Sequence, residues 1–104
     1  MAIRRACSYK AIFTTAEDPA NYSAILITIQ QNGQNIINKS LGDAGVSIEE
    51  DTVVLELNQQ ETSQFVAGIT ALIQIRCYES EYNAPGSAVF GVEVGRALND
   101  EILP

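Results

Sequence analysis

Residues 24–39 have the sequence AILITIQQNGQNIINK. Isoleucines at positions 25, 27 and 29 alternate with Leu26, Thr28 and Gln30, a period of two that is typical of a strand with one buried face. Asn32-Gly33 follows, and both residues tolerate the positive φ angles of a type I′ turn. The stretch therefore predicts a β-hairpin whose second strand covers residues 35–39.

Short apolar runs of the same period lie on both sides of this hairpin, at residues 9–13, 46–48, 52–57, 69–78 and 87–94. Turn-forming residues separate them, a spacing that favours a sandwich or barrel over alternating strands and helices. The β character is lost between residues 58 and 65. The composition there predicts one short helical turn near residues 59–65, which tucks Phe65 under the edge of a sheet and ends at Gly68.

These elements predict an all-β fold, an immunoglobulin-like β-sandwich of about seven strands, forming a single domain over residues 1–104. The Cys…Trp…Cys pattern of antibody domains is absent because the chain has no tryptophan. A small closed barrel is the alternative. The last residues, 97–104, mix apolar and acidic side chains and fit a short helix or an edge segment.

The alternation also predicts which side chains face the core. The inward set comprises Ala71, Ile73, Ile75 and Cys77 in the longest strand, and Ala88, Phe90, Val92 and Val94 in the last one. Four apolar residues fall on faces assigned to the outside: Leu26, Val54, Leu72 and Val89. An exterior this apolar favours a protein partner. The alternative is that irregular strands bury some residues from both faces.

The charge distribution argues against two classes of partner. The chain has 13 acidic and 6 basic residues, a net charge of −7, and its basic residues are scattered. Nucleic acids and anionic membranes are bound through basic patches, so we expect neither as a partner. No apolar run approaches the ~20 residues of a membrane span, and the basic pair Arg4-Arg5 is not followed by the apolar segment of a secretion signal.

The sequence also offers little material for catalysis. It contains no histidine, which removes the commonest general base and most zinc sites. Cys7 and Cys77 lie 70 positions apart, and we expect buried free thiols, with a disulfide as the alternative. The acids at positions 49–51 fit a solvated turn. We therefore predict no enzyme activity, no cofactor and no metal.

One polar-aromatic cluster stands out, with Tyr78 and Tyr82 close to Asn83. Tyrosines in loops make good contact residues because they offer a large area at low cost in side-chain entropy. We predict a partner contact made by Tyr78, Tyr82 and Asn83 together with Leu72 and Val54. The alternative is that the rings pack over the end of the core. A small ligand- or carbohydrate-binding module is the second functional hypothesis, and it would need a cleft with converging aromatic and polar groups.

The second half of the chain resembles a family of small phage proteins. The resemblance covers roughly residues 53–103 and is carried by LNQQET at 57–62, Phe65, Gly68, IQIR at 73–76, Ser87, VEV at 92–94 and LNDEIL at 98–103. This order is similar to small structural proteins of tailed phages and prophages of gut Firmicutes, and to immunoglobulin-like N-terminal domains of phage baseplate proteins. The resemblance implies a non-enzymatic virion component of the tail, baseplate or capsid accessory layer, assembled in the bacterial host cytoplasm. Its implied partners are other phage structural proteins and further copies of itself.

Overall fold

The computed structural model describes residues 2–15, 17–84, 89–96 and 102–103. Within these ranges it contains nine strands and two short helical turns: β1 (Ile3–Arg4), β2 (Tyr9–Thr14), η1 (Pro19–Asn21), β3 (Ala24–Gln31), β4 (Gln34–Ser40), β5 (Val46–Glu49), β6 (Thr52–Leu57), α1 (Gln59–Thr62), β7 (Ala71–Tyr78), β8 (Phe90–Val92) and β9 (Val94–Gly95). The prediction of an all-β chain with one helical turn near residue 60 is confirmed.

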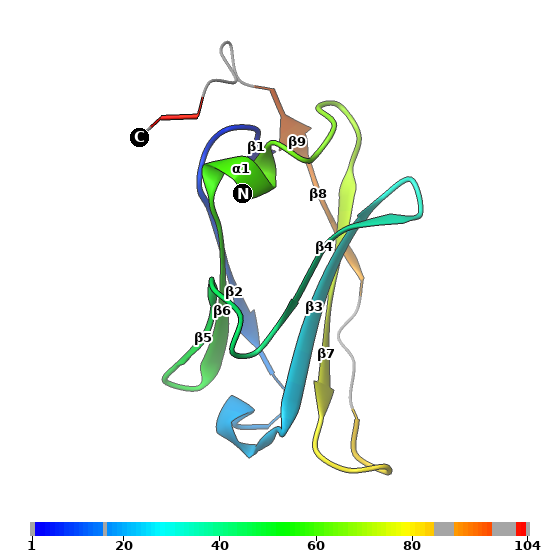
Figure 1. Cartoon of the computed structure of the whole chain (residues 1–104). Helices are drawn as coiled ribbons and strands as arrows, with labels where there is room; N and C mark the ends of the chain where they lie inside the picture. Colours follow the sequence, from blue (N-terminus) through cyan, green and yellow to red (C-terminus); the bar gives the residue numbers. More distant parts are fainter. Residues whose placement is uncertain (1, 16, 85–88, 97–101, 104) are drawn as a thin grey trace.

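The strands form two facing layers (Figure 1). One layer is a four-stranded sheet in the order β4-β3-β7-β8, and the other is a three-stranded sheet in the order β2-β6-β5, all neighbours being antiparallel. The short β1 pairs in parallel with β9, at the end of the molecule where α1 also lies. The sequence pattern did not predict β1, because two residues are too few to show a period.

The predicted hairpin is present. Asn32 and Gly33 have φ angles of 52° and 76°, so both adopt the left-handed conformation that a type I′ turn requires. Their turn joins β3 to β4, and an irregularity in the pairing between Ile29 and Gln30 shifts the register of the two strands. Such a bulge increases the local twist of an edge strand, which makes pairing with another chain less favourable.

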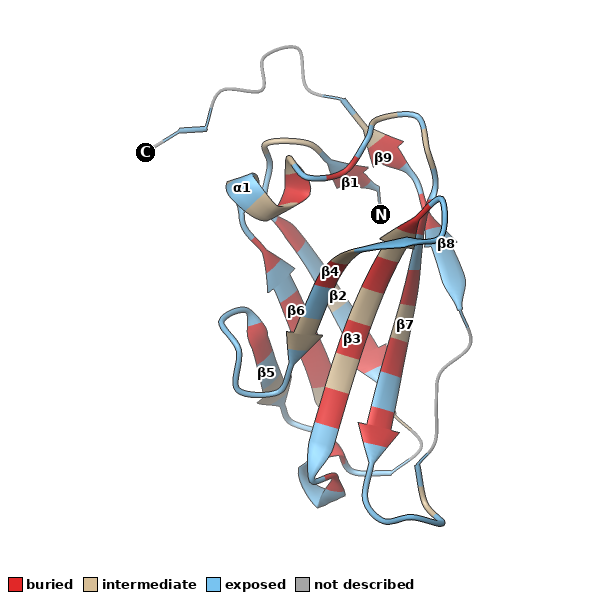
Figure 2. Ribbon diagram, turned by 45° about the vertical axis from the view of Figure 1, so that its right-hand side comes forward, coloured by how far each residue is buried: buried red, intermediate tan, exposed pale blue. Residues whose placement is uncertain are grey.

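The core lies between the layers, as the alternation of buried and exposed residues along β3 and β7 shows (Figure 2). Ile25, Ile27 and Ile29 from β3 meet a core cluster that includes Ile73 and Ile75 from β7. All five are almost fully buried, as the period of two predicted. Burial of each such side chain contributes about 2 kcal/mol to folding.

The short helix α1 begins with a reciprocal cap. The side chain of Asn58 accepts a hydrogen bond from the Glu61 backbone N–H, and the Glu61 carboxylate accepts one from the Asn58 N–H. The helix ends at Thr62 with Ser63 as its C-cap, so the prediction that Gly68 ends it is wrong. The prediction that Phe65 packs inward is confirmed, since its ring is almost fully buried.

Three predictions about single side chains are also wrong. Val54 is fully buried, not outward-exposed, because it lies in the central strand β6 with Ile12 of β2 and Ser47 of β5 opposite it on either side. Phe90 is exposed, because it lies in the short edge strand β8, although its ring still contacts Phe13 with 5.9 Å between the ring centroids. Cys7 is exposed, because it lies in the connection between β1 and β2.

The remaining sequence predictions have mixed outcomes. Cys7 and Cys77 are both free thiols, and Cys77 is buried as expected. Leu72 and Val89 are exposed and Leu26 is half-buried, in agreement with their predicted outward faces. The predictions for Ala88 and for most of residues 97–104 lie outside the described residues. None of the helices in the described ranges is long and apolar enough to cross a membrane.

Candidate functional site: the outer face of the four-stranded sheet

The side chains that point away from the core on β3, β4 and β7 form one continuous surface, which we call the outer face. Antiparallel pairing sets these residues side by side in rows across the strands. The outer face comprises Ala24, Leu26, Thr28, Gln30, Asn35, Asn38, Ser40, Leu72, Gln74, Arg76 and Tyr78.

The outer face is almost free of charge. Arg76 is the one charged residue among these eleven positions, although the whole chain contains 13 acidic and 6 basic residues. The rest are apolar, hydroxyl or amide side chains. The cores of protein–protein interfaces are depleted of charged residues in the same way, because a buried charge must lose its hydration.

Two amide-bearing pairs order the polar part of this face. Thr28 donates a hydrogen bond from its hydroxyl to the Asn38 side-chain oxygen at 3.0 Å, and the Gln30 amide donates to the Asn35 side-chain oxygen at 2.6 Å. These side chains already have partners on the protein. Covering the face with another molecule therefore leaves fewer polar groups unsatisfied than a face of isolated amides would.

The structure brings together only part of the predicted contact set. Leu72 and Tyr78 both lie on the outer face, with 44% and 46% of their surfaces exposed, at opposite ends of β7. Tyr82 follows in the turn after β7 and is 95% exposed. Asn83 is half-buried near it and donates hydrogen bonds to the carboxylates of Glu17 and Glu79. Val54 belongs to the other sheet and does not contribute.

Sequence reasoning missed the residue that distinguishes this face, Arg76. The alternation of Leu72, Gln74, Arg76 and Tyr78 is visible in the sequence and indicates a shared side of one strand. Which side chains lie next to them is not visible there. Only the pairing of β7 with β3 places Arg76 beside Leu26 and away from every acidic strand residue.

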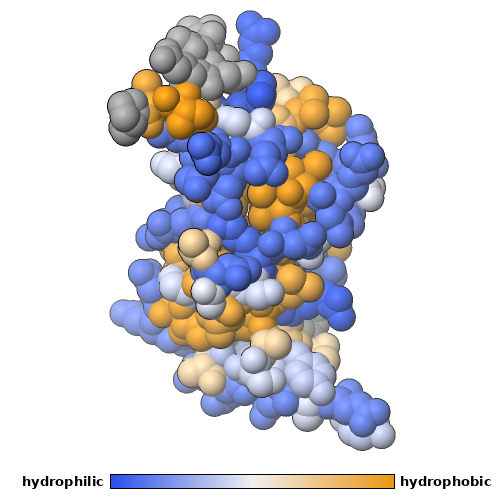
Figure 3. Space-filling view, in the orientation of Figure 1, coloured by the Kyte–Doolittle hydropathy of each residue, from blue (hydrophilic) through white to orange (hydrophobic). Residues whose placement is uncertain are grey.

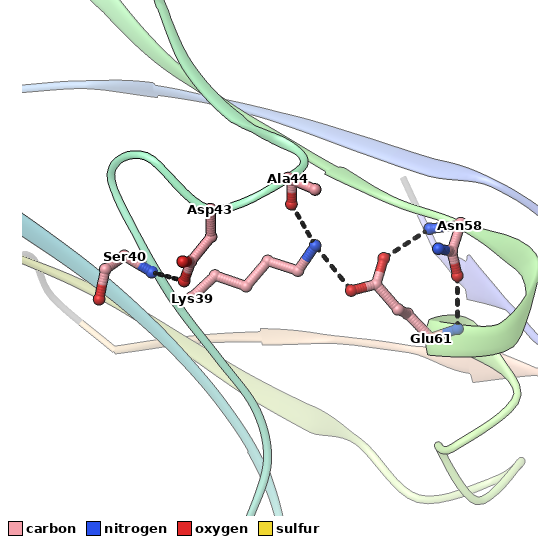
Figure 4. Close-up of polar contacts among 6 residues, drawn as sticks. All are labelled: Lys39, Ser40, Asp43, Ala44, Asn58 and Glu61. Atoms are coloured by element: carbon pink, nitrogen blue, oxygen red, sulfur yellow. Dashed lines mark hydrogen bonds and ion pairs between the residues drawn. The ribbon is translucent and has the colours of Figure 1, made fainter.

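A second polar cluster lies where β4 faces α1, and its role is structural (Figure 4). The Lys39 ammonium group donates to the Ala44 carbonyl at 2.6 Å and pairs with the Glu61 carboxylate at 2.6 Å. Lys39 lies opposite Ile27, on the side of β4 that faces the core, so its chain crosses the gap between the two sheets. An inward-pointing charge also protects an edge strand against pairing with other chains.

The face of the molecule drawn in Figure 3, which has the orientation of Figure 1, shows apolar surface only in separate patches divided by hydrophilic residues. Asp43 contributes to the hydrophilic part by accepting a hydrogen bond from the Ser40 backbone N–H at 2.7 Å. The cluster holds the two layers together, with two of the three N–H donors of the Lys39 ammonium group engaged. Among the described residues, no three His, Cys, Asp or Glu side chains gather in a way that could hold a metal ion.

Comparison with known proteins supports the architecture alone. No family model and no curated protein matches the chain. Among solved structures, it is similar to a strand-swapped dimer of the immunoglobulin-like domain of mouse leukocyte-associated immunoglobulin-like receptor 1. That match has a TM-score of 0.53 and 11% identity, and covers 90% of this chain and 85% of the other. The fold is an immunoglobulin-like β-sandwich.

Two further structures are also similar. A second strand-swapped dimer, of the extracellular domain of the same mouse receptor, gives a TM-score of 0.51 and 11% identity over 89% of this chain and 84% of the other. The V domain of amphioxus IgVJ-C2 gives a TM-score of 0.38 and 9% identity over 91% and 99% of the two chains. At 11% identity, the two mouse receptor matches show the fold alone.

Proposed function

We propose that this chain is a non-enzymatic structural module of a phage virion, in the tail, baseplate or capsid accessory layer, and that it works through protein–protein contacts made by the outer face. The observation that carries the proposal is the nearly uncharged outer face on a chain of net charge −7. An acidic protein gains solubility from its charges, so a face almost without them is best explained by a partner that covers it.

The virion assignment is supported by the resemblance of residues 53–103 to small phage structural proteins. The proposed partners are other phage structural proteins and further copies of this chain. The two mouse receptor structures are dimers that exchange strands, an example of an immunoglobulin-like sandwich that pairs with a copy of itself. The absence of histidine from the sequence agrees with a role without catalysis.

The alternative, a small ligand- or carbohydrate-binding module, has no specific support in the described residues. Tyr82 is too exposed to form a pocket with Tyr78, and the Asn83 amide is already bonded to two carboxylates. A binding site for a small ligand needs a concave surface on which such groups converge.

The test is incorporation into particles. Particles released by the bacterium that encodes the chain would be purified on a density gradient and probed for the chain by immunoblot. Tagged Leu72→Lys and Tyr78→Lys variants would be compared with Val66→Lys, which places the same charge at an exposed position outside the outer face. We expect the wild type and Val66→Lys to be incorporated, and the two outer-face variants to be reduced about 10-fold, because a buried unpaired charge costs over 1.4 kcal/mol.

The absence of the chain from purified particles would refute the virion role. Equal incorporation of all variants would refute the role of the outer face. Far-ultraviolet circular dichroism of each variant would show that it is folded.

A further inference from the structure

Arg76 is the one charge on the outer face, and its side chain has no partner among the described residues. Its side chain is exposed, and within the described residues it makes no hydrogen bond and no ion pair. Its neighbour on the adjacent strand β3 is Leu26. If a partner covers this face, the guanidinium group must either meet a carboxylate or lose its hydration without compensation, which is strongly unfavourable.

This requirement excludes the simplest dimer. Two copies that pair face to face about a two-fold axis would bring the same eleven positions together. Because none of these positions carries an acidic residue, both Arg76 side chains would be buried without a counter-ion. The acidic group that Arg76 needs must come from a different surface.

The opposite sheet of the same chain presents such a surface at the turn between β5 and β6. Glu49, Glu50 and Asp51 are consecutive and exposed, and their carboxylates make no hydrogen bond or ion pair within the described part of the chain. Among the other described carboxylates, Glu61 pairs with Lys39 and Asp43 accepts from a backbone N–H. Glu56, Glu81 and Glu93 are exposed as well, but they do not form a run of consecutive acids as the turn does.

We propose that the outer face of one copy receives the β5–β6 turn of a second copy, with Arg76 pairing with the carboxylates of Glu49 and Asp51. This inference rests on the proposed function and names one partner of the outer face. Arginine binds carboxylates through two parallel hydrogen bonds, and Arg and Tyr are the residues that most often dominate binding energy at interfaces. Here Tyr78 lies next to Arg76 on the same side of β7.

The contact is head to tail. The turn belongs to the three-stranded layer and the outer face to the four-stranded layer, so the two surfaces lie on different sides of the sandwich (Figure 1). Each copy can therefore donate a turn and receive another at the same time. A contact of this kind builds a ring if the rotation closes and an open array if it does not.

Charge reversal tests the pairing on the full chain. Arg76→Glu gives the face the same sign as the turn, and Glu49→Lys/Asp51→Lys gives the turn the same sign as the face. Each variant alone should associate at least 10-fold more weakly than the wild type, measured as mass by light scattering over a concentration series. An equimolar mixture of the two variants should recover association to within about 3-fold of the wild type, because each face then meets a turn of opposite charge.

Two matched controls separate pairing from net charge. Lys10→Glu makes the same charge change as Arg76→Glu at an exposed position of β2, and Glu81→Lys/Glu93→Lys makes the same change as the turn variant. Both controls should associate like the wild type. Association of the wild type should weaken in about 1 M sodium chloride, where the Debye length is about 3 Å.

The outcomes distinguish this inference from the function on which it rests. A wild type that associates but is insensitive to both charge reversals, or a mixture that fails to recover, overturns the head-to-tail contact and leaves the structural role intact. A wild type that stays monomeric at every concentration also overturns it. Absence of the chain from purified particles would instead overturn the virion role.

Discussion

Replacing Lys39 by methionine should lower the free energy of unfolding by about 2 kcal/mol. Exposed ion pairs contribute roughly 0.2–1 kcal/mol, and removal of one partner of a fully buried pair costs about 3–5 kcal/mol. The Lys39 and Glu61 side chains are 11% and 20% exposed, so this pair lies between those limits. Methionine retains the apolar stem of the lysine, which limits the loss to the ammonium group and its two partners.

A double-mutant cycle isolates the ion pair from the other role of Glu61. One Glu61 oxygen accepts the hydrogen bond from the Asn58 N–H, and the other pairs with Lys39. Glu61→Gln keeps the first contact, because glutamine also serves at this position of a capping box, and removes the charge. We expect a coupling energy of about 1–2 kcal/mol between Lys39→Met and Glu61→Gln.

Urea unfolding followed by far-ultraviolet circular dichroism is the suitable assay, because the chain has no tryptophan whose fluorescence could be followed. Lys10→Met is the control. Lys10 is exposed and lies opposite Glu56 across the β2–β6 pair, so its loss should cost less than about 1 kcal/mol. A coupling energy below about 0.3 kcal/mol, within the scatter expected of independent sites, would refute the argument that this pair joins the two layers.

Three further changes test other parts of the packing. Gly45→Ala should destabilise the protein by roughly 2–4 kcal/mol in urea unfolding, because φ is +90° and the new Cβ would lie 2.3 Å from the Glu56 carbonyl oxygen. The control Gly42→Ala also has a positive φ but meets open space, so it should cost only about 1–2 kcal/mol. Equal losses of stability in the two variants would contradict the steric argument. Thr62→Val should cost about 1–3 kcal/mol in thermal unfolding, because the buried hydroxyl donates to the Cys7 carbonyl at 2.8 Å, and an unchanged melting temperature would show that this bond is unimportant. Burial raises the pKa of the Cys77 thiol, so above about pH 8.5 the unfolded state loses this proton before the folded state does and the free energy of unfolding falls. A Cys77→Val variant should show a smaller fall over that range, and an identical pH profile would contradict the assignment.

Much of the fold was predictable because it depends on local patterns. The Asn32-Gly33 turn and the alternating isoleucines of β3 define a hairpin within 16 consecutive residues, counted from 24 to 39. The helical turn was predictable for a similar reason, since its capping residues are three positions apart. The outer face was predictable in part, because Leu72 and Tyr78 share one side of β7.

What remained unpredictable depends on which strands become neighbours. Val54 follows the outward pattern, yet it is buried because β6 is the central strand of its sheet. Phe90 follows the inward pattern, yet it is exposed because β8 is an edge strand. The period of two assigns a side chain to a face, but its burial depends on the strands that flank it.

The sequence by itself determined the strand-rich composition, the principal hairpin and the inward faces of β3 and β7, because these follow from the chirality and period of the backbone over a few residues. The tertiary structure alone decided that Lys39 reaches Glu61 across the two layers. It also decided that Arg76 lies among uncharged neighbours and that the Glu49–Asp51 turn lies on the opposite sheet. Those relations join residues far apart in the chain, and a contact between them exists only after both sheets have formed and packed.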